Sequence, residues 1–363
     1  MIRIVHVIGQ LRTGGAETVA MNILRYTSQD IFQNDFIVFG DKIGNLENEA
    51  LKRGSKVHHI PFPKDGYMRF VKNIKKIITD NNYEIIHSHT LLNNGVVAYA
   101  ARKTNIRLII SHSHSTNNGK ETNNFIYHLY EKTMKKLIIR DSDLLISCGV
   151  DAGKYLYNDS PFDVINNGID FLLYKFDLFN RKKIRNELAC EENCILIGHV
   201  GRMEVVKNQE FLIKICEQFD KKKIKVKFLL IGDGSLKDSI QKKISDNNLN
   251  AQFKLLGNRQ DVGKFLSAMD VMVFPSLYEG VPLTLVEAQV NGLPCVVSDT
   301  ISSEVDIFKN VNFISLSENI DIWIKKIVDS KRIIVTQEMF ECSGYDIMTE
   351  IKKMENIYLS KMR

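Results

Sequence analysis

Short apolar runs rich in β-branched residues alternate with amphipathic stretches along this 363-residue chain. The stretch containing Val19, Ile23 and Leu24, for example, has the spacing of a helix that buries one face. Alternation of this kind predicts parallel sheets covered by helices on both faces. The expected strands are 2–9, 35–40, 56–61, 84–89, 106–112, 143–148, 162–166, 194–200, 226–232, 252–256, 271–275, 294–298 and 311–315.

The alternation occurs separately in each half of the chain, and the chain is long enough for two cores. We therefore expect an α/β protein with two doubly wound, Rossmann-like domains. The pattern places the join between them at 166–170, which a polar stretch follows. The predicted domains are 1–170 and 171–340, and the remaining segment, 341–363, is expected to form a helix.

Residues 274–289 carry the most informative pattern in the chain. An apolar strand is expected to lead into a tight loop with Glu279, and a helix to begin near Pro282. The backbone N–H groups expected to be free there are those of Gly280, Val281, Leu283 and Thr284. With the helix dipole these groups form an anion site. Glu279 before the helix and Glu287 one turn inside it add two carboxylates, so the pattern suits a nucleotide sugar.

A second strand and glycine turn, at 198–208, place two cations in one loop. Arg202 and Lys207 follow the turn at Gly201, and a helix is expected to begin near Asn208. Two fixed cations neutralise a diphosphate, and Arg does so with bidentate geometry. Taken singly, a carboxylate at a helix start is more often a cap, and an Arg in a loop is more often solvated. Their combination in one strand–helix array favours the ligand site.

The candidate residues share one position in the predicted topology. Ligands of doubly wound sheets bind beyond the carboxyl ends of the strands. The candidates found at such ends are Gly14, Gly15, His87, His89, His112, His114, Arg202, Lys207, Gly232 and Glu279. For the two histidine pairs, a solvated pair or a pair satisfied within the core is the alternative interpretation.

On these residues the chain resembles the retaining glycosyltransferases of family 4, which have the GT-B fold of two Rossmann-like domains. The motifs that match are Gly14-Gly15-Ala16-Glu17, Gly201-Arg202-x4-Lys207-Asn208, Gly232-Asp233-Gly234 and Glu279-x7-Glu287. Residues 296–300 and 344–347 are similar to enzymes that build bacterial capsular polysaccharides and exopolysaccharides. The resemblance implies transfer of a hexose or N-acetylhexosamine from a UDP-sugar, with retention, onto a lipid-linked oligosaccharide. It also implies that the last helix packs back onto the N-terminal domain.

The resemblance implies roles for individual residues as well. Glu287 is expected to bind the ribose hydroxyls, Glu279 the transferred sugar, and His112 the donor sugar or phosphate. His89 and His114 are expected on the acceptor side. The residues expected to frame the base and ribose are Gly232, Asp233, Gly257 and Asn258. Gly14 and Gly15 lack a Cβ atom, so their loop can approach the diphosphate closely, although an ordinary turn is the alternative.

The leaving diphosphate needs its growing negative charge stabilised, which a metal or fixed cations can do. The single Asp-x-Asp of the sequence, Asp141-Ser142-Asp143, precedes a strand and so lies at the wrong end of a sheet. It is interpreted as a helix end and turn. Arg202, Lys207 and the backbone amides are then the expected electrophilic catalysts, with no metal and no cofactor. The six scattered cysteines are expected to be reduced thiols of a cytoplasmic protein.

The positive charge of the chain is uneven. Residues 1–168 hold 21 basic against 16 acidic residues, and the rest hold 28 against 27. The segments 67–78 and 125–140 mix aromatic, apolar and cationic positions at helical spacing. We expect an anionic membrane surface as partner, with the protein peripheral on the inner face of the plasma membrane and no nucleic-acid partner. Helices packed on the sheet, and charge that serves solubility alone, are the alternatives.

Three other classes of protein are alternatives to a transferase. A sugar-nucleotide epimerase would lack the Glu279/Glu287 pair. A phosphorylase would need a lysine for pyridoxal phosphate and a much longer chain. A non-catalytic sugar-nucleotide-binding partner of another transferase is the alternative that differs most in kind, and the presence of Arg202, Lys207 and Glu279 argues against it.

Overall fold

The computed structural model describes residues 1–12, 14–115, 124–191, 193–279 and 281–362. The chain divides into two compact units. Unit 1 comprises Met1–Gly168 and Ile347–Arg363, and unit 2 comprises Ile169–Asp346. The sequence placed the two boundaries after residues 170 and 340.

Unit 1 contains a seven-stranded parallel sheet with the strand order β3-β2-β1-β4-β5-β6-β7. Its strands are β1 (Ile2–Ile8), β2 (Phe32–Phe39), β3 (Val57–Ile60), β4 (Ile85–Ser88), β5 (Leu108–Ser113), β6 (Leu144–Ser147) and β7 (Asp163–Val164). Its helices are α1 (Gly15–Tyr26), α2 (Glu47–Lys52), α3 (Tyr67–Asp80), α4 (Asn94–Ala101), α5 (Phe125–Asp141), α6 (Val150–Tyr157) and α15 (Ile347–Met362), with 3-10 turns at Pro63–Asp65 and Leu91–Asn93.

Unit 2 contains a six-stranded parallel sheet with the strand order β10-β9-β8-β11-β12-β13. Its strands are β8 (Ile195–Val200), β9 (Val226–Ile231), β10 (Phe253–Leu255), β11 (Val271–Phe274), β12 (Cys295–Ser298) and β13 (Val311–Ile314). Its helices are α7 (Phe171–Tyr174), α8 (Leu178–Glu187), α9 (Glu210–Lys221), α10 (Lys237–Asp246), α11 (Val262–Ala268), α12 (Leu283–Val290), α13 (Ile320–Asp329) and α14 (Gln337–Glu341), with 3-10 turns at Val205–Lys207 and Ser303–Val305.

The prediction of two doubly wound α/β domains is confirmed, since both sheets are parallel and each predicted strand overlaps an observed one. The strand ends differ most at β2, which begins three residues earlier than predicted, and at β7, which is reduced to Asp163–Val164. The β7 segment is exposed at the edge of its sheet, so little apolar burial holds a longer strand there.

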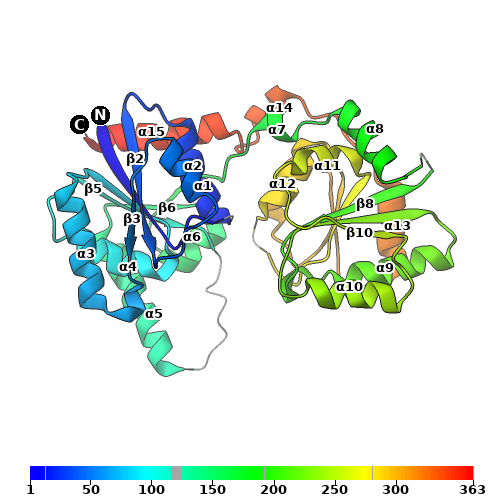
Figure 1. Ribbon diagram of the computed structural model, residues 1–363, viewed down its shortest axis with the longest axis horizontal. Coiled ribbons are helices and arrows are strands. Elements are labelled where there is room, and N and C mark those ends of the chain that lie inside the picture. The colour runs from blue at the N-terminus through cyan, green and yellow to red at the C-terminus, as the bar shows by residue number, and fades with distance from the viewer. Residues whose placement is uncertain (13, 116–123, 192, 280, 363) are drawn as a thin grey trace. The chain divides into compact units, whose positions relative to one another are not determined.

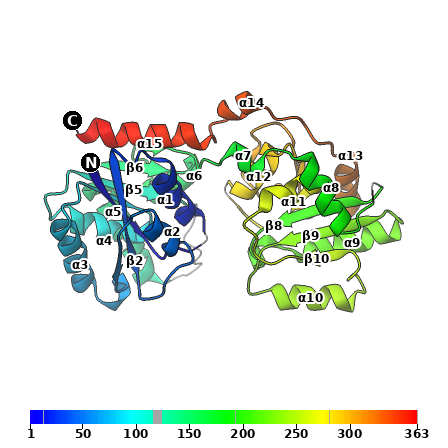
Figure 2. The same cartoon turned by 45° about the horizontal axis from the view of Figure 1, so that its top comes forward.

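Helices cover both faces of the unit 1 sheet (Figure 1). On one face α3, α4 and α5 pack against Val5, Ile86 and Ile109, and on the other α1 and α15 pack against Ile4 and Ile85. Figure 2 shows α15 lying along this second face. Residues far apart in the sequence therefore share one core.

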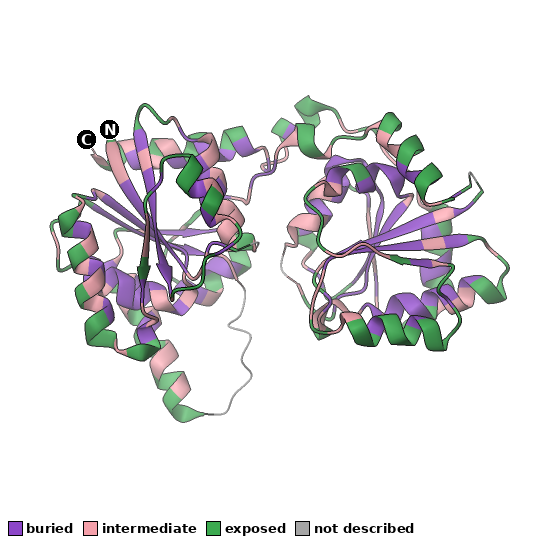
Figure 3. Ribbon diagram, viewed as in Figure 1, coloured by how far each residue is buried: buried purple, intermediate pink, exposed green. Residues whose placement is uncertain are grey.

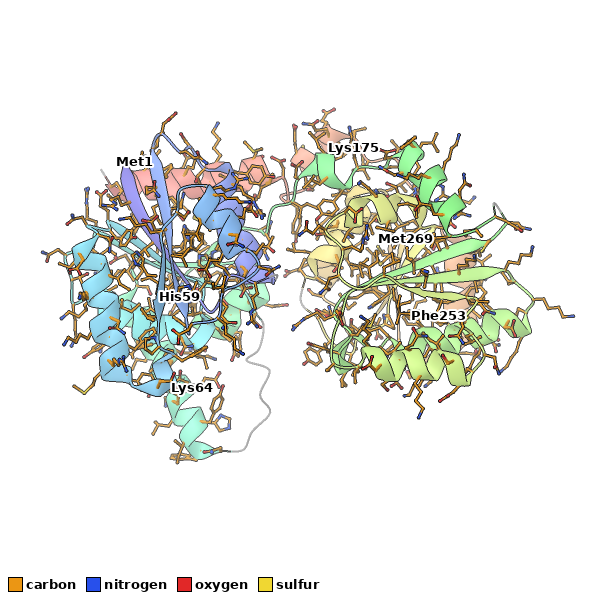
Figure 4. The ribbon with its side chains drawn as sticks, in the orientation of Figure 1. Met1, His59, Lys64, Lys175, Phe253 and Met269 are labelled. Carbon is orange, nitrogen blue, oxygen red and sulfur yellow. The ribbon has the colours of Figure 1, made fainter. Side chains whose placement is uncertain are left out.

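Unit 2 repeats this arrangement with a different set of helices. Helices α8, α11 and α12 pack against Leu196 and Met272 on one face, whereas α9, α10 and α13 pack against Ile197 and Val273 on the other. In Figure 3 the strands of both units are largely buried, while the exposed residues lie mainly on the outward sides of the helices and in the loops. Side chains fill the space between each sheet and its helices, as Figure 4 shows around Met269 and Phe253.

The packing of α15 onto unit 1 predicts a large difference between two methionines of the same helix. Met354 is 1% exposed in the core beneath α15, whereas Met348 is 57% exposed. Met354→Ala should lower the free energy of unfolding of unit 1 by about 2–4 kcal/mol, because it leaves a cavity. Met348→Ala is the matched control and should change it by less than about 0.5 kcal/mol. Hydrogen exchange of β1 and β4 measures both, and equal effects would contradict this packing.

Candidate functional site

Two loops at the carboxyl edge of the unit 2 sheet are joined directly to each other. The loop after β8 accepts a hydrogen bond at the Val206 carbonyl from the Leu277 N–H (2.8 Å) in the loop after β11. The Asn208 side-chain amide donates to the Pro275 carbonyl (3.0 Å). Helix α9 begins at Glu210, near Asn208 as predicted, and the left-handed backbone of Asn208 (φ 51) keeps that residue itself outside the helix.

Lys207 and Glu279, which come from these two loops, form an ion pair. The Lys207 Nζ atom lies 2.5 Å from a Glu279 carboxylate oxygen, and the side chains are 15% and 19% exposed. Nζ also lies 4.7 Å from the centre of the Phe274 ring. Partial burial strengthens this pairing relative to one in water. The sequence identified both residues but gave no sign that they touch.

Helix α12 begins at Leu283, and Pro282 is its N-cap residue with an extended backbone (φ −71, ψ 120). The prediction that the helix begins near Pro282 is therefore confirmed, with Pro282 directly before the first helical residue. The Leu285 N–H donates to the Pro282 carbonyl (2.9 Å). The N–H groups of Leu283 and Thr284 precede it in the first turn, where helical N–H groups have no intrahelical acceptor. Val281 lies half-buried just before this turn. Gly280 lies outside the described residues.

Glu287 projects from the second turn of α12 beside Tyr174 of α7. Burial raises the pKa of the Glu287 carboxyl to about 7, and the hydrogen bond with Tyr174 opposes that shift. A carboxyl group with this pKa changes its charge near neutral pH. Tyr174 was not anticipated, because it lies in a four-residue helix more than a hundred residues away in the chain.

Two glycines allow the loop after β9 to pack on the loop after β8. Gly232 has φ +135, and a Cβ atom there would lie 2.1 Å from the Gly201 carbonyl oxygen. A Cβ atom on Gly234 would lie 2.4 Å from the Met203 carbonyl oxygen. The Met203 N–H donates to the Asp233 carbonyl (3.0 Å), which holds the two loops together. Gly232 and Gly234 are therefore needed for the packing of the two loops, whether or not they also contact a ligand.

Asp233 and Asn258 lie on neighbouring loops of this edge. The Asp233 carboxylate accepts a hydrogen bond from the Gly234 N–H (2.8 Å) and pairs with Lys237 (3.3 Å). The backbone bond is the larger cause that lowers the pKa of Asp233. Asn258 is exposed and follows Gly257, whose carbonyl accepts from the Gly232 N–H (2.8 Å).

Arg202, like Asn258, is an exposed residue of the predicted site. Its side chain is 75% exposed and pairs with Glu204 (3.0 Å). Its backbone is held by a buried chain, in which Gln209 donates to the Arg202 carbonyl (2.8 Å) and contacts His199 Nε2 (3.3 Å). His199 Nδ1 in turn donates to the Val273 carbonyl (3.0 Å), and burial lowers the pKa of His199 to about 4. Gln209 and His199 were missed, although His199 stood out as an ionisable residue within an apolar strand.

The remaining predicted residues belong to unit 1. Gly14 is the N-cap of α1 and Gly15 its first residue. A Cβ atom on Gly14 would lie 2.3 Å from a Glu17 carboxylate oxygen, so the carboxylate folds back over the start of the helix.

Five histidines, four of them buried and His114 half-buried, form a cluster on one face of the unit 1 sheet, and we call it the histidine cluster. Its members are His6, His87, His89, His112 and His114. The rings hydrogen-bond one another and stack, with centroids 4.0 Å apart for His112 and His114 and 4.2 Å for His87 and His89. Burial lowers the pKa of every member, to about 4 for His6 and about 3 for His114. Each ring is therefore neutral at pH 7.

Candidate metal ligands in the described ranges are confined to this cluster. In each of two groups, His6/His87/His89 and His89/His112/His114, the ring nitrogens lie within 4.8 Å of one another. Asp141 ends α5 and Asp143 pairs with Arg102 (2.5 Å), which confirms their interpretation as a helix end and turn. The six cysteines are free thiols. The described helices include none with the length and apolar character needed to cross a bilayer.

Comparison with known proteins identifies both units. Residues 13–171 match the family model "Glycosyltransferase Family 4", and residues 180–329 match "Glycosyl transferases group 1". The chain is 31% identical over 372 residues to EpsF of Bacillus subtilis (strain 168), which is named as a glycosyltransferase, and the match covers 98% of this chain and 96% of EpsF.

Two further proteins are similar over most of their length. The UDP-Gal:alpha-D-GlcNAc-diphosphoundecaprenol alpha-1,3-galactosyltransferase of Escherichia coli is 27% identical, with 80% of this chain and 79% of that protein covered. Among solved structures, Anabaena Alr3699/HepE in complex with UDP superposes with a TM-score of 0.80 at 20% identity, covering 99% of this chain and 100% of that one. HepE has also been solved with UDP-glucose (TM-score 0.78).

The neutral histidine cluster predicts acid-sensitive stability of unit 1. Its pKa values lie below the unfolded value of about 6.5, so the unfolded chain binds more protons as the pH falls from 7 to 5. The free energy of unfolding should therefore fall as the pH falls, by roughly 2 kcal/mol between pH 7 and pH 5 for each histidine that stays neutral in the folded protein.

Urea unfolding at pH 7.5 and pH 5 measures this acid effect. Hydrogen exchange of β1, β4 and β5 reports unit 1, whereas fluorescence of the single tryptophan, Trp323 in α13, reports unit 2. The loss should be larger in unit 1, because unit 2 contains one such buried histidine, His199. Equal stability of unit 1 at the two pH values would contradict the assignment of neutral rings.

Proposed function

The chain belongs to the family 4 glycosyltransferases, and on that premise we propose a specific reaction for it. It transfers a hexose or N-acetylhexosamine from a UDP-sugar, with retention, onto a lipid-linked oligosaccharide in capsular or exopolysaccharide synthesis. The observation that carries the proposal is the Lys207–Glu279 pair at the carboxyl edge of unit 2, in the loops that lead to α9 and α12. The UDP and UDP-glucose complexes of HepE support the donor, and the name of the E. coli relative supports the acceptor.

The chemistry of the donor site follows from its charges. Negative charge grows on the β-phosphate as the sugar departs, and fixed donors stabilise that charge without reorganising. Lys207, Arg202 and the first-turn N–H groups of α12 are the donors we assign to the diphosphate. The positive end of the α12 dipole acts in the same direction. A metal ion is not required by this arrangement, so we propose that activity is metal-independent.

The two glutamates have separate roles in this proposal. Glu287 accepts hydrogen bonds from the ribose hydroxyls, and the partly buried Glu279 contacts the transferred sugar. A diphosphate that approaches Lys207 competes with Glu279 for the ammonium group, which leaves the Glu279 carboxylate available to sugar hydroxyls. Gly232, Asp233 and Asn258 line the neighbouring loops on which we place the base and ribose.

For unit 1 we propose that His112 binds the donor sugar or phosphate and that His89 and His114 face the acceptor. The approach of Gly14 and Gly15 to the diphosphate stays a prediction. The protein would act in the cytoplasm at the inner face of the plasma membrane, where polyprenyl-linked saccharides are available. The uneven charge of the two halves of the chain supports this location.

The direct test is a panel of UDP-sugars with a polyprenyl diphospho-saccharide acceptor, read out as release of UDP in buffer containing EDTA. One donor should be turned over, and nuclear magnetic resonance of the product should show the anomeric configuration of the donor. Binding of UDP-sugars with no turnover would favour a non-catalytic binding partner instead. Activity that disappears in EDTA and returns with manganese or magnesium would show that the fixed cations are insufficient.

Removing either cation of the diphosphate site should reduce the rate far more than the stability. Lys207→Ala and Arg202→Ala should each lower kcat by about 10²–10³, the usual effect of losing one transition-state donor. Lys243→Ala is the matched control, since Lys243 pairs with Glu210 (2.5 Å) in the same unit and is 46% exposed. Near-full turnover by Lys207→Ala would show that the diphosphate lies elsewhere.

The two glutamates should differ in calorimetric titrations with UDP. Glu287→Gln should weaken UDP binding, whereas Glu279→Gln should leave it nearly intact and reduce sugar transfer. Because the pKa of Glu287 is about 7, its ionised fraction, and with it wild-type affinity for UDP, should fall about fivefold from pH 7 to pH 6. The Glu287→Gln variant should lose this dependence. Equal weakening in both variants, or in neither, would mean that the roles are wrongly divided.

Membrane binding should depend on the exposed cations and apolar residues of α3 and α5. Lys72 and Lys76 are exposed on α3, opposite its buried residues, and Phe125 and Ile126 are 78% and 75% exposed at the start of α5. A groove of about 660 Å³ beside α5 is lined by Lys132, Lys135, Lys136, Arg140, His128, Glu131, Ile139 and Asn158. We expect the protein to sediment with anionic vesicles at low salt and to dissociate at high salt.

Charge reversal tests this surface. Lys72→Glu with Lys76→Glu should weaken vesicle binding, since each cation near an anionic surface contributes about 1 kcal/mol. The matched control is the pair Lys221→Glu and Lys243→Glu on helices of unit 2. Vesicle binding that is absent at low salt, or equally weakened by the control pair, would exclude docking through this surface.

A further inference from the structure

Two ring nitrogens of the histidine cluster are buried and have no hydrogen-bond partner among the described residues. They are His112 Nε2 and His114 Nδ1, on rings whose centroids lie 4.0 Å apart. A buried polar atom without a partner destabilises a fold, so such atoms in a native structure call for an explanation. Which of the two carries a proton follows from the partners of the other rings.

One chain of hydrogen bonds runs from Asn34 through His6 and His89 to His114. Thr27 donates its hydroxyl hydrogen to the Ile23 carbonyl (2.6 Å), so the Asn34 group that faces Thr27 (3.0 Å) must be its NH₂ group. The Asn34 Oδ1 atom therefore accepts from His6 Nε2 (3.0 Å), which must carry the proton of that neutral ring. The other ring nitrogen, His6 Nδ1, is then bare, meaning that it carries no proton and can accept a hydrogen bond.

The same reasoning passes along the rest of this chain. Bare His6 Nδ1 accepts from His89 Nε2 (3.2 Å), and bare His89 Nδ1 accepts from His114 Nε2 (2.9 Å). His114 Nδ1 is consequently a bare acceptor. Asn34, at the other end of the chain, fixes this state.

A second chain of hydrogen bonds runs from Tyr358 of α15 through His87 to His112. The Tyr358 hydroxyl is fully buried, and His87 Nδ1 (2.8 Å) is its hydrogen-bond partner within the described ranges, so the hydroxyl donates to it. His87 Nε2 then carries the proton and donates to His112 Nδ1 (3.1 Å). His112 Nε2 is consequently an N–H donor. The two chains thus present one donor and one acceptor side by side.

A hydroxyl group can satisfy both atoms at once, because it accepts one hydrogen bond and donates another. A phosphate oxygen can only accept, so it would meet the lone pair of His114 Nδ1. We propose that His112 and His114 together bind one saccharide hydroxyl, with His112 donating and His114 accepting. This proposal rests on the proposed glycosyltransferase function. It narrows the ligand of His112 from sugar or phosphate to a saccharide hydroxyl, and it replaces contact of His89 with the acceptor by a positioning role, because both ring nitrogens of His89 are used within the cluster. His6, His89, His87 and Tyr358 act as positioning residues that fix the tautomers.

The tautomers can be observed directly by ¹⁵N spectroscopy of the full-length protein labelled in its histidines. All five rings should show protonated Nε2 and bare Nδ1 at pH 7. Protonated Nδ1 on His114 or bare Nε2 on His112 would overturn the proposal. Zn²⁺ added in equimolar amount should leave the cluster resonances in place, whereas Zn²⁺ coordination by these rings would make the cluster a metal site instead. This measurement needs no turnover, so it decides the proposal even if the proposed function fails.

Addition of ligands then identifies the source of the hydroxyl. The ¹⁵N resonance of His114 Nδ1 should shift on saturation with a UDP-sugar or with a polyprenyl diphospho-saccharide. UDP-glucose and UDP-N-acetylglucosamine probe the donor, and polyprenyl diphospho-N-acetylglucosamine probes the acceptor. A shift with UDP alone, or no shift with any saccharide that the enzyme turns over, would contradict a saccharide hydroxyl at this place.

Two substitutions of His114 distinguish the role of its bare Nδ1 atom from that of Nε2, which hydrogen-bonds to His89. The amide of Asn occupies roughly the place of Nδ1, and that of Gln roughly the place of Nε2. His114→Asn should retain most of the saccharide affinity, whereas His114→Gln should raise KM for the substrate that shifts Nδ1 about tenfold. Tyr358→Phe removes the start of the other chain, far from the bound hydroxyl. It should change the His112 tautomer and raise the same KM, and an unchanged spectrum with unchanged KM would count against the positioning role.

Discussion

A parallel sheet covered by helices on both faces leaves one place where polar side chains can gather, namely its carboxyl edge. In unit 2 the core on either face is apolar, and the loops after β8, β9 and β11 meet at that edge. Close approach of these loops depends on Gly232 and Gly234, and the Lys207–Glu279 pair joins two of them. The donor site we propose follows from this arrangement, because opposite charges are held together before any ligand arrives.

Unit 1 differs from unit 2 because polar side chains also lie on one of its helix-covered sheet faces, where the five histidines form their cluster. His87 of β4, His112 of β5 and His6 of β1 take the place of the apolar residues found nearer the amino ends of those strands, and His89 and His114 directly follow β4 and β5. Such burial is tolerable because the rings satisfy one another. Two side chains from outside the cluster, Asn34 and Tyr358, set the direction of every bond. The C-terminal helix therefore contributes to the chemistry of this face as well as to its core.

The fold, and the residues that lie at the carboxyl ends of the strands, could be predicted from the sequence. The alternation of apolar runs determines the topology of the sheets, and the topology determines which residues lie at the carboxyl edge. The sequence could not supply pairs such as Lys207 with Glu279 or Tyr174 with Glu287, since these depend on side-chain packing between distant segments. The sequence also indicated the helix starts near Pro282 and Asn208, although the exact first residues, Leu283 and Glu210, depend on cap geometry that includes the left-handed backbone of Asn208. His6 was missed because its partners, Asn34 and His89, are adjacent only in the folded sheet.

The central claim is that fixed charges and helix N–H groups of unit 2 bind the diphosphate of the donor without a metal. Hydrogen exchange of the whole protein with and without UDP, in buffer containing EDTA, tests it most directly. We expect UDP to protect the backbone of the loop at 201–207, of residues 232–234 and of the first turn of α12, with no added metal. Protection confined to other segments, or seen only when magnesium or manganese is supplied, would contradict the account.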